Sequence, residues 1–267
     1  MEAQSYVFSK IISSDLGADE HYHVPKYQRE YTWGKGNWEQ LIHDIDENPK
    51  GYFMGSIICV SESILPGHEK IYQVIDGQQR LMTLSLLMAA IFSRLQALKD
   101  SLEFEDDNEM IHFLTTVSGL HSKLVKKKKD FLAGEQGGVI EKSAMCFLRV
   151  QPSKQNHNLD DYLFILSEIG VLTEKAKPAY CGLRIMYKGY QYFVDQLESL
   201  HLDELLELVA KINQLNFVLI SVNTSADAFT LFETLNNRGV PLSATDIIKN
   251  KILSEMETKH NIDIDDS

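Results

Sequence analysis

The spacing of hydrophobic residues along the chain changes several times, and each change predicts a new element. From Gln79 onward, apolar residues recur three and four positions apart, which predicts a helix of about twenty residues. β-type runs predict strands at 20–24, 52–60, 71–75 and 217–222, and the second and third of these form a hairpin. Helical spacing predicts further helices at 37–47, 159–169, 180–198, 202–212, 226–236 and 244–257.

The middle of the chain has a weaker pattern. Residues 101–145 are acidic and then basic, and we interpret them as helical with breaks, including a loop at Gly134 and Gly137-Gly138. Residues 146–150 are interpreted as a short strand, and the acidic tail 263–266 as disordered. The four lysines Lys126, Lys127, Lys128 and Lys129 lie either on a solvated helix face or at a nucleic-acid contact, and we favour the first interpretation.

Charge and composition narrow the class of protein. The formal net charge of −12 argues against strong binding of duplex DNA by this chain alone, because such domains usually present a basic face. Three scattered cysteines without a C-x-x-C spacing fit a reducing, cytoplasmic setting and exclude a cysteine-based zinc knuckle. We find no signal-peptide pattern and no apolar run of the roughly 18 residues that cross a bilayer, so we expect no membrane partner.

The segment Ile75-Asp76-Gly77-Gln78-Gln79-Arg80 joins a predicted strand to a predicted helix. Asp-Gly is also a common hairpin turn, but a helix follows here. Free N–H groups and the positive end of the dipole in a first helical turn favour an anion, and Gly77 lets the backbone approach it closely. A structural turn and a phosphate site remain about equally supported by chemistry alone.

In the phosphate interpretation, the side chains of this segment have separate roles. Arg80 is disfavoured by the helix dipole unless it pairs with phosphate, and Gln78, Gln79 and Thr83 add further donors. Asp76 either holds Mg²⁺ and orients a water, or only caps the helix. No G-x-x-x-x-G-K-[ST] sequence is present, so the chain is not a P-loop protein.

Two other segments carry candidate binding residues. In 27–33 (YQREYTW), Tyr27 and Arg29 are suited to stack a base and clamp a phosphate, whereas we assign the tryptophans to packing. In 232–243 (FETLNNRGVPLS), a helix stop explains the glycine and the serine, but Asn236 and Arg238 are free to reach a polar ligand. Asn156-His157-Asn158 superficially resembles a His-Asn nuclease motif, but no second metal-ligand cluster accompanies it.

The three segments, in this order, resemble motifs of the GmrSD-type restriction family. They are Val24 to Trp33 (I-P-x-Y-Q-R-x-Y-x-W in the family), Asp76 to Leu84 (D-G-Q-Q-R-x-T-L), and Phe232 to Lys249 (F-x-x-L-N-x-x-G-x-x-L-S-x-x-D-x-x-K). The resemblance runs from about residue 5 to 256, and Met82 departs from it by standing where the family often has Thr.

This resemblance implies a mixed α/β (α+β) fold, with a small ParB/sulfiredoxin-like mixed sheet containing a hairpin and a larger helical region. It divides the chain into a nucleotide-binding core (1–100), a mainly helical region (101–215), a strand and helices completing the core site (216–257), and an acidic tail (258–267). It also implies an NTP-hydrolysing regulatory domain that uses NTP and Mg²⁺ and works with a separate His-Asn-His nuclease domain or subunit. In that interpretation Asp76, Gln79 and Arg80 are catalytic, Asp76 holds the metal, and Tyr27, Arg29, Gly77, Gln78, Thr83, Asn236 and Arg238 bind the nucleotide. A nucleotide-gated module without turnover and a ParB-like DNA nuclease are the alternatives, and DNA is only a weak partner of this chain alone.

Overall fold

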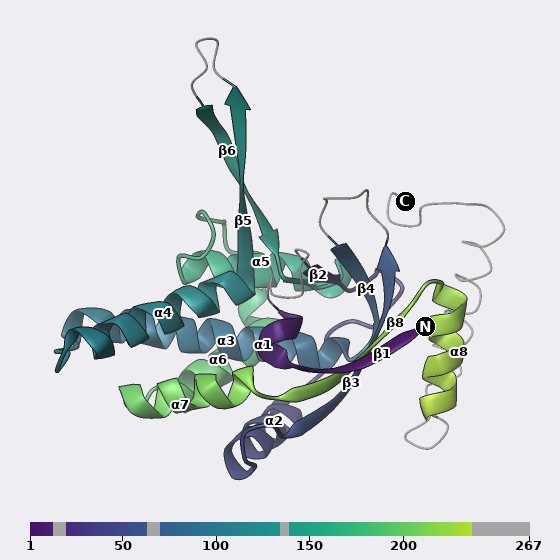
Figure 1. The fold of residues 1–267 in the computed structure, drawn as a ribbon, viewed down its shortest axis with the longest axis horizontal. Helices are drawn as coiled ribbons and strands as arrows, with labels where there is room; N and C mark the ends of the chain where they lie inside the picture. Colours follow the sequence, from purple (N-terminus) through teal and green to yellow (C-terminus); the bar gives the residue numbers. More distant parts are fainter. Residues whose placement is uncertain (13–19, 63–69, 134–138, 237–267) are drawn as a thin grey trace.

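A six-stranded mixed sheet with helices on both faces forms the body of the protein, in a computed structural model that describes residues 1–12, 20–62, 70–133 and 139–236 (Figure 1). The mixed α/β class predicted from the sequence is confirmed. The strand order is β1-β8-β3-β4-β2-β7, and a separate pair, β5-β6, forms a second sheet. The strands are β1 (Glu2–Val7), β2 (Glu20–His23), β3 (Phe53–Glu62), β4 (Lys70–Asp76), β5 (Val125–Ala133), β6 (Val139–Leu148), β7 (Val150–Gln151) and β8 (Asn216–Val222).

The centre of the sheet joins segments that are far apart in the sequence. β3 and β4 pair antiparallel, which confirms the predicted hairpin. The late strand β8 lies between β1, with which it is antiparallel, and β3, with which it is parallel. On the other side, β2 pairs parallel with both β4 and β7. The chain therefore returns to the sheet after the helical region.

Helix α3 (Gln78–Leu98) is the central helix, and every residue from Leu81 through Phe92 is buried. A helix that is apolar on all sides belongs inside a core. In the described part of the chain it alone is long and apolar enough to cross a membrane. Of its most apolar 18-residue stretch, 72% is buried inside the protein. The other α-helices are α1 (Phe8–Ile11), α2 (Lys35–Glu47), α4 (Asp107–Leu124), α5 (Asn158–Glu168), α6 (Ile185–Leu197), α7 (Leu202–Asn213) and α8 (Ser225–Asn236).

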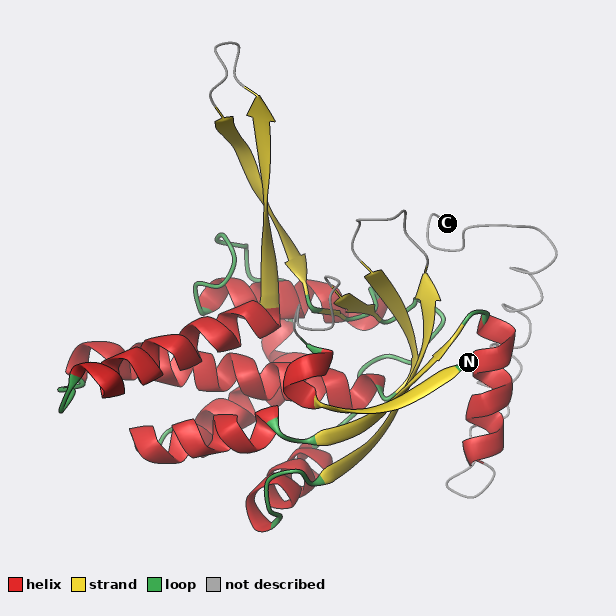
Figure 2. Ribbon diagram, in the orientation of Figure 1, coloured by secondary structure: helices red, strands yellow, loops and turns green. Residues whose placement is uncertain are grey.

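The two faces of the sheet have separate apolar clusters. The larger cluster joins one face to helices α1 through α7 and contains Trp38, Phe113 and Phe193. The smaller cluster lies under α8 on the other face, where Tyr27 and Ala228 cover apolar side chains of β3, β4 and β8. Figure 2 shows the helical layer on one side of the twisted sheet and α8 alone on the other.

The prediction of helix over residues 125–145 is wrong. Residues 125–133 and 139–148 form the antiparallel pair β5-β6, which projects from the body in Figure 1. Lysine is a good helix former, and strand formation depends on the partner strand. The local sequence therefore did not reveal the pairing with residues beyond 138. Lys126 through Lys129 therefore lie in a strand and not on a helix, whereas the predicted loop at 134–138 lies outside the described residues.

Other boundaries differ modestly from prediction. The strand predicted at 146–150 is divided at Arg149 between β6 and β7. Helix α6 begins at Ile185 and not at 180, because Tyr180 has left-handed backbone and a 3-10 turn, Cys181–Leu183, intervenes. The first strand and helix, β1 and α1, were not predicted. The helix predicted at 244–257 and the acidic tail lie outside the described residues.

Candidate functional site at the start of helix α3

The turn between β4 and α3 depends on Gly77. Its backbone is left-handed, with φ of 90° and ψ of −1°. A Cβ atom there would lie 3.0 Å from the carbonyl oxygen of Ser56 and 3.2 Å from the side chain of Ile57. The first bond of the helix runs from the N–H of Leu81 to the carbonyl of Gly77. The N–H groups of residues 78–80 precede it and have no acceptor within the helix, as expected for a first turn.

Arg80 is bound to strand β3. Its Nη1 donates to the carbonyl of Met54 at 2.7 Å and its Nη2 to the carbonyl of Ser56 at 3.0 Å. Gly55 has no side chain and leaves room for the guanidinium: a Cβ there would lie 1.7 Å from Nη1 of Arg80. Burial lowers the pKa of Arg80, and Asp76, 3.9 Å away, opposes this shift. The guanidinium therefore fastens α3 to β3, on the side occupied by Asp76.

Gln79 fastens the loop 27–33 to the same turn. Its Oε1 accepts hydrogen bonds from the N–H groups of Thr32 (2.9 Å) and Trp33 (3.2 Å), and its Nε2 donates to the carbonyl of Glu30 (2.9 Å). The side chain is 95% buried. Both ends of the amide are thus engaged, and Gln79 positions the loop without an amide group to spare for a ligand.

Thr83 also bonds inside the protein. Its hydroxyl lies 2.8 Å from the Tyr31 hydroxyl and donates to the Gln79 carbonyl at 2.7 Å. Trp38 donates its indole N–H to Tyr31, and burial raises the pKa of Tyr31 to about 12. Thr83 is fully buried, so this hydroxyl connects the loop to α3 and is not open to a nucleotide in this conformation. The assignment of Trp38 to packing is confirmed by its 4% exposure.

The third segment approaches the site through α8. Tyr27 is buried against Phe229, with ring centroids 5.9 Å apart. Phe232 packs on the same cluster, at the start of the predicted motif. Asn236 is the last residue of α8, and Arg238 lies outside the described residues. The structure thus brings Tyr27 next to the helix of the third segment, where the tyrosine ring packs in the core.

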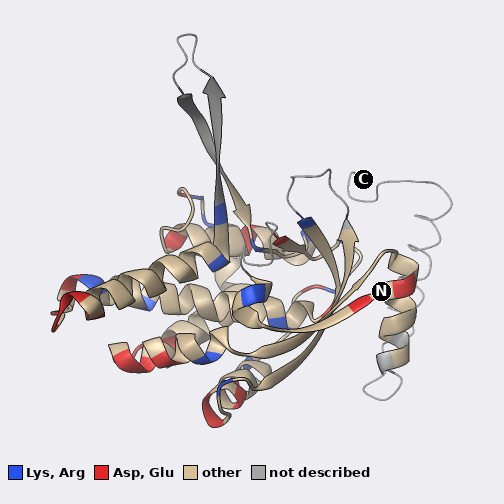
Figure 3. Ribbon diagram, viewed as in Figure 1, with Lys and Arg blue, Asp and Glu red and all other residues tan. Residues whose placement is uncertain are grey.

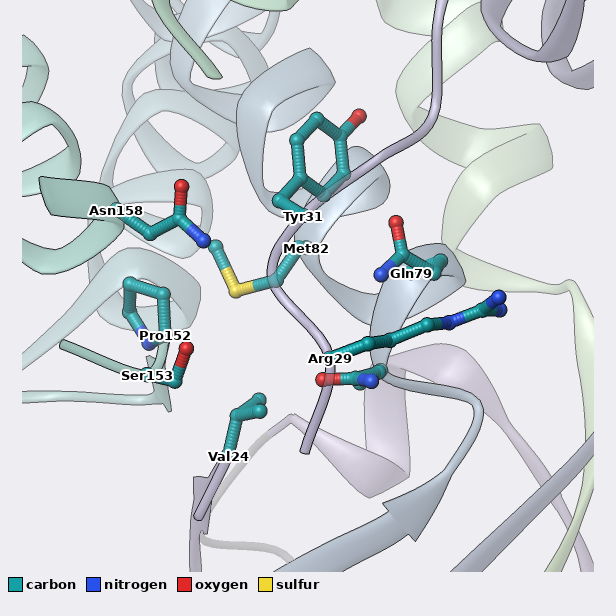
Figure 4. A pocket seen from close by; sticks show the side chains of 9 residues that line it. Val24, Arg29, Tyr31, Gln79, Met82, Pro152, Ser153 and Asn158 are labelled. Carbon is teal, nitrogen blue, oxygen red and sulfur yellow. The ribbon is translucent and has the colours of Figure 1, made fainter. Parts of the chain in front are cut away.

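A small cavity lies beside the first turn of α3. It encloses about 190 Å³, including open solvent, and is lined by Val24, Arg29, Tyr31, Gln78, Gln79, Met82, Pro152, Ser153 and Asn158 (Figure 4). Gln78 donates weakly to Gln28 at 3.5 Å. Arg29 is exposed, and its guanidinium points away from Asn158 (Figure 4). The predicted residues are therefore divided: Arg29, Gln78 and Gln79 face the cavity, whereas Arg80 and Asp76 lie towards β3.

Comparison with known families places these motifs in a known context. A sequence model described as the GmrSD restriction endonuclease, N-terminal domain, matches residues 7–253. The chain belongs to this family. The GmrSD domain is thus part of a restriction-system protein. A search of curated proteins found no match to the GmrSD chain.

Two residues at the cavity of this GmrSD domain were not predicted from sequence. Ser153 follows β7 and Asn158 is the first residue of α5, and both are at least 96% buried. Asn158 belongs to the Asn156-His157-Asn158 triplet that we considered only as a nuclease motif. The backbones of Asn156 and His157 are left-handed, with φ of 48° and 60°. Asn and His adopt left-handed backbone more readily than most residues, but only the fold brings this segment to α3.

A catalytic metal cluster is not preformed among the described residues of the GmrSD domain. No group of three or more His, Cys, Asp or Glu side chains is close enough to hold an ion there. Asp76, whose side chain is 32% exposed, is a single carboxylate beside Gly77. Mg²⁺ in phosphate-transfer sites typically uses one or two carboxylates together with phosphate oxygens, so one carboxylate suits an ion that arrives with its nucleotide.

Proposed function

We propose that this GmrSD N-terminal domain binds a nucleoside triphosphate with its phosphates at the start of α3, and hydrolyses it as a regulatory step. The observation that carries the proposal is the left-handed Gly77, after which α3 begins beside a cavity lined by Arg29, Gln78 and Gln79. Anions favour such helix starts because of the free N–H groups and the dipole. Because the chain has a net charge of −12, it repels anions as a whole, and an anion would bind only where local donors favour it.

The role of each residue follows from its contacts. The N–H groups of Gln78 and Gln79 and the exposed guanidinium of Arg29 are the donors proposed for the phosphates. Gln79, Thr83 and Arg80 hold the loop and β3 around that turn, so we now propose them as positioning residues. Tyr27 would support this loop from the other face of the sheet. Asn236 and Arg238 remain proposed as residues that close the site from the third segment.

Mg²⁺ would supply charge neutralisation for the phosphates, with Asp76 as its protein ligand or as the group that orients the attacking water. Phosphoryl transfer depends mainly on positioning and electrostatic stabilisation. The exposed Arg29 at the cavity and the carboxylate of Asp76 on the β3 side of the turn would provide both. This proposal requires Asp76 to reach the nucleotide from the β3 side of the turn.

Nucleotide binding is tested by thermal shift with a panel of NTPs and Mg²⁺. A ligand that binds only the folded state raises the melting temperature in proportion to the logarithm of its concentration. We expect Arg29→Ala to reduce the NTP-dependent shift. Arg94→Ala is the matched control, because this variant also lacks one guanidinium. Arg94 lies near the other end of α3, where it donates to the Glu198 carbonyl. Equal shifts in all three proteins would contradict the assignment of Arg29.

Hydrolysis is tested separately by phosphate release. We expect Asp76→Asn to retain NTP binding but to lose most turnover, because the amide keeps the shape and removes the charge that places Mg²⁺. Binding without turnover in the unmodified protein would favour the alternative, a nucleotide-gated module. Nicking of a plasmid by the chain alone, with divalent metals, would instead favour the DNA nuclease.

We further propose that the domain acts with a nuclease domain or subunit and in the cytoplasm. Membership of a restriction family supports the first proposal, and the odd number of free cysteines fits the second. DNA contact by this chain alone is proposed to be weak because of its net charge.

A further inference from the structure

The large apolar side chains that remain exposed are concentrated in two places on the surface. In the described part of the chain they are Met1, Phe53, Met110, Ile111, Leu114, Tyr180 and Leu183. Three of them lie on α4 and two lie in the short turn before α6, so five of the seven belong to two patches. An isolated exposed apolar residue is ordinary, whereas apolar residues gathered on the surface mark an interaction site.

The first patch, which we call the α4 face, consists of Met110, Ile111 and Leu114. Their side chains are 38%, 56% and 46% exposed. At 3.6 residues per turn, Leu114 lies between Met110 and Ile111 around the helix, so the three form one strip. The core-facing side of the same helix carries Phe113 and Leu120, which are 1% and 2% exposed. The α4 face therefore remains exposed after α4 has packed on the body.

Acidic residues border the α4 face at the beginning of the helix. Residues 103–109 contain five acidic residues and no basic one. Asp106 caps α4 by accepting from the N–H of Glu109 at 2.9 Å, and Glu109 in turn accepts from the N–H of Glu105 at 2.7 Å. Figure 3 shows acidic residues gathered at this end of α4. An apolar strip with an acidic border is complementary to an apolar surface with a basic border.

The second patch, which we call the turn patch, consists of Tyr180 and Leu183, which are 78% and 70% exposed. The N–H of Leu183 donates to the Tyr180 carbonyl at 3.0 Å, and Tyr180 has left-handed backbone with φ of 59°, which is uncommon for a bulky residue. Arg184 fixes the turn, because its Nε donates to Asp161 and its Nη1 to the Ala179 carbonyl, both at 2.6 Å. A fixed turn loses little freedom when it binds a partner.

The turn patch has a basic border. Residues 175–188 contain four basic residues and no acidic one. Lys175 and Lys188 are exposed, whereas Arg184 is paired with Asp161. In a chain with a net charge of −12, this segment is a local exception. The turn patch and the α4 face thus have apolar centres and borders of opposite charge.

We propose that two copies of this chain associate, with the turn patch of each copy packed on the α4 face of the other. α4 and α6 both pack on α3, so the two patches belong to the same helical layer (Figure 1). Because each copy presents both patches, the contact occurs twice about a two-fold axis. Stable dimers bury about 1,200–2,000 Å² in total, and each of two equal contacts supplies half of that area. An exposed tyrosine on a fixed turn is a typical anchor of such a contact.

The test is sedimentation velocity over a range of protein concentrations, without nucleotide, so that its result does not depend on the proposed function. We expect the unmodified chain to dimerise. Tyr180→Ala/Leu183→Ala and Ile111→Ala/Leu114→Ala should each raise the Kd of the dimer by about tenfold or more, because each removes one side of both contacts. Alanine favours helix, so the second variant should fold. Higher salt should also weaken the dimer, because the charged borders are exposed.

Phe53→Ala is the matched control, because it also removes an exposed large apolar side chain but lies at the start of β3, outside both patches. Its dimer should have the Kd of the unmodified chain. Melting curves check that each variant is folded. A chain that stays monomeric at every concentration overturns the inference.

A mixture of the two double variants, one of them carrying a fluorescent label, tests which surfaces meet. Either variant alone forms no complete contact, whereas a mixed dimer forms one complete contact out of two. The mixed dimer should therefore have a lower Kd than either variant alone. An α4-face variant that dimerises like the unmodified chain, or a mixed dimer no tighter than the dimers of the separate variants, would show that the two patches do not meet.

Discussion

At the scale of single residues, Arg80 has a role that its position in the sequence conceals. A cation in a first helical turn suggests a bound anion, yet this guanidinium donates to two backbone carbonyls of β3. The planar guanidinium holds its donors in a fixed fork that matches two neighbouring acceptors, a geometry that the single nitrogen of lysine does not offer. The residue therefore connects the helix start to the sheet whether or not a ligand is present.

Arg80→Ala should lower the free energy of unfolding by about 2–4 kcal/mol, because two partly buried carbonyls lose charged donors. Arg80→Lys should recover only part of this loss. Urea denaturation without nucleotide measures both. Gly55→Ala offers an independent check, because its Cβ would occupy the position of the guanidinium. Unchanged stability in Arg80→Ala would restore the guanidinium to the role of a ligand group.

Glu20 is a buried carboxyl, 3% exposed, at the beginning of β2. Burial raises its pKa above the ordinary value of 4.5, although Lys70, Arg149 and the hydroxyls of Tyr72 and Tyr22 oppose the shift. The folded protein thus binds a proton more tightly than the unfolded chain. The stability that the protonated Glu20 contributes is fully present below pH 4.5. It is lost as the pH rises through the higher pKa that Glu20 has in the folded state.

Glu20→Gln should therefore stabilise the protein at neutral pH relative to the unmodified chain, and the difference should shrink towards pH 4.5. Urea unfolding across this range measures it. Glu2→Gln serves as the control, because Glu2 is exposed. A loss of stability at neutral pH in Glu20→Gln would mean that the ionised carboxylate is the stabilising form.

At the scale of elements, one side chain determines how the loop 27–33 lies on α3. The loop has no regular structure, and three of its backbone groups bond to the amide of Gln79. The hydroxyls of Tyr31 and Thr83 add a second connection one turn later. Because Arg29 lies in this loop, its position relative to the helix start depends on these bonds.

Gln79→Ala should release the loop while leaving α3 helical. We expect faster hydrogen exchange at the amides of Thr32 and Trp33, which lose their acceptor, and little change at the amides of α3 beyond its first turn. Gln79→Glu is the informative second variant, because it keeps an acceptor but cannot donate to Glu30. Unaltered exchange in the loop would show that the tyrosine and threonine bond suffices to hold it.

At the scale of the whole molecule, the order of strands makes the two ends of the sequence interdependent. β8 lies between β1 and β3, so residues 216–222 complete a sheet that begins at residue 2. The apolar cluster under the helices likewise joins Phe8 to Phe217, whose ring centroids are 5.7 Å apart. A division of the chain into two parts at residue 215 would therefore cut through one continuous core.

A chain that ends at Gln214 should fail to unfold cooperatively, because β1 loses its partner and one edge of β3 is exposed. A chain that ends at Asn236 is the matched control, since it keeps β8 and α8. Thermal unfolding followed by circular dichroism compares them. A cooperative transition in the shorter chain would identify residues 1–214 as an independent folding unit.

The sequence alone determined the elements whose information is local. The apolar residues of α3 recur at helical spacing, and the Asp-Gly pair before the helix marks the end of β4. The mixed α/β class, the β3-β4 hairpin and the family followed from these patterns and the three motifs. Turn residues and helical periodicity act within a few positions, so they can be recognised without the fold.

Only the tertiary structure decided which polar residues face the cavity. Arg80 and Gln79 bond to residues 24 to 49 positions away, and Asn158 reaches the start of α3 from a distant segment. The same holds for β5, whose lysines form a strand only because residues 139–148 pair with it. Hydrogen bonds between distant segments and the burial of polar groups depend on the packed chain, and no local pattern encodes them.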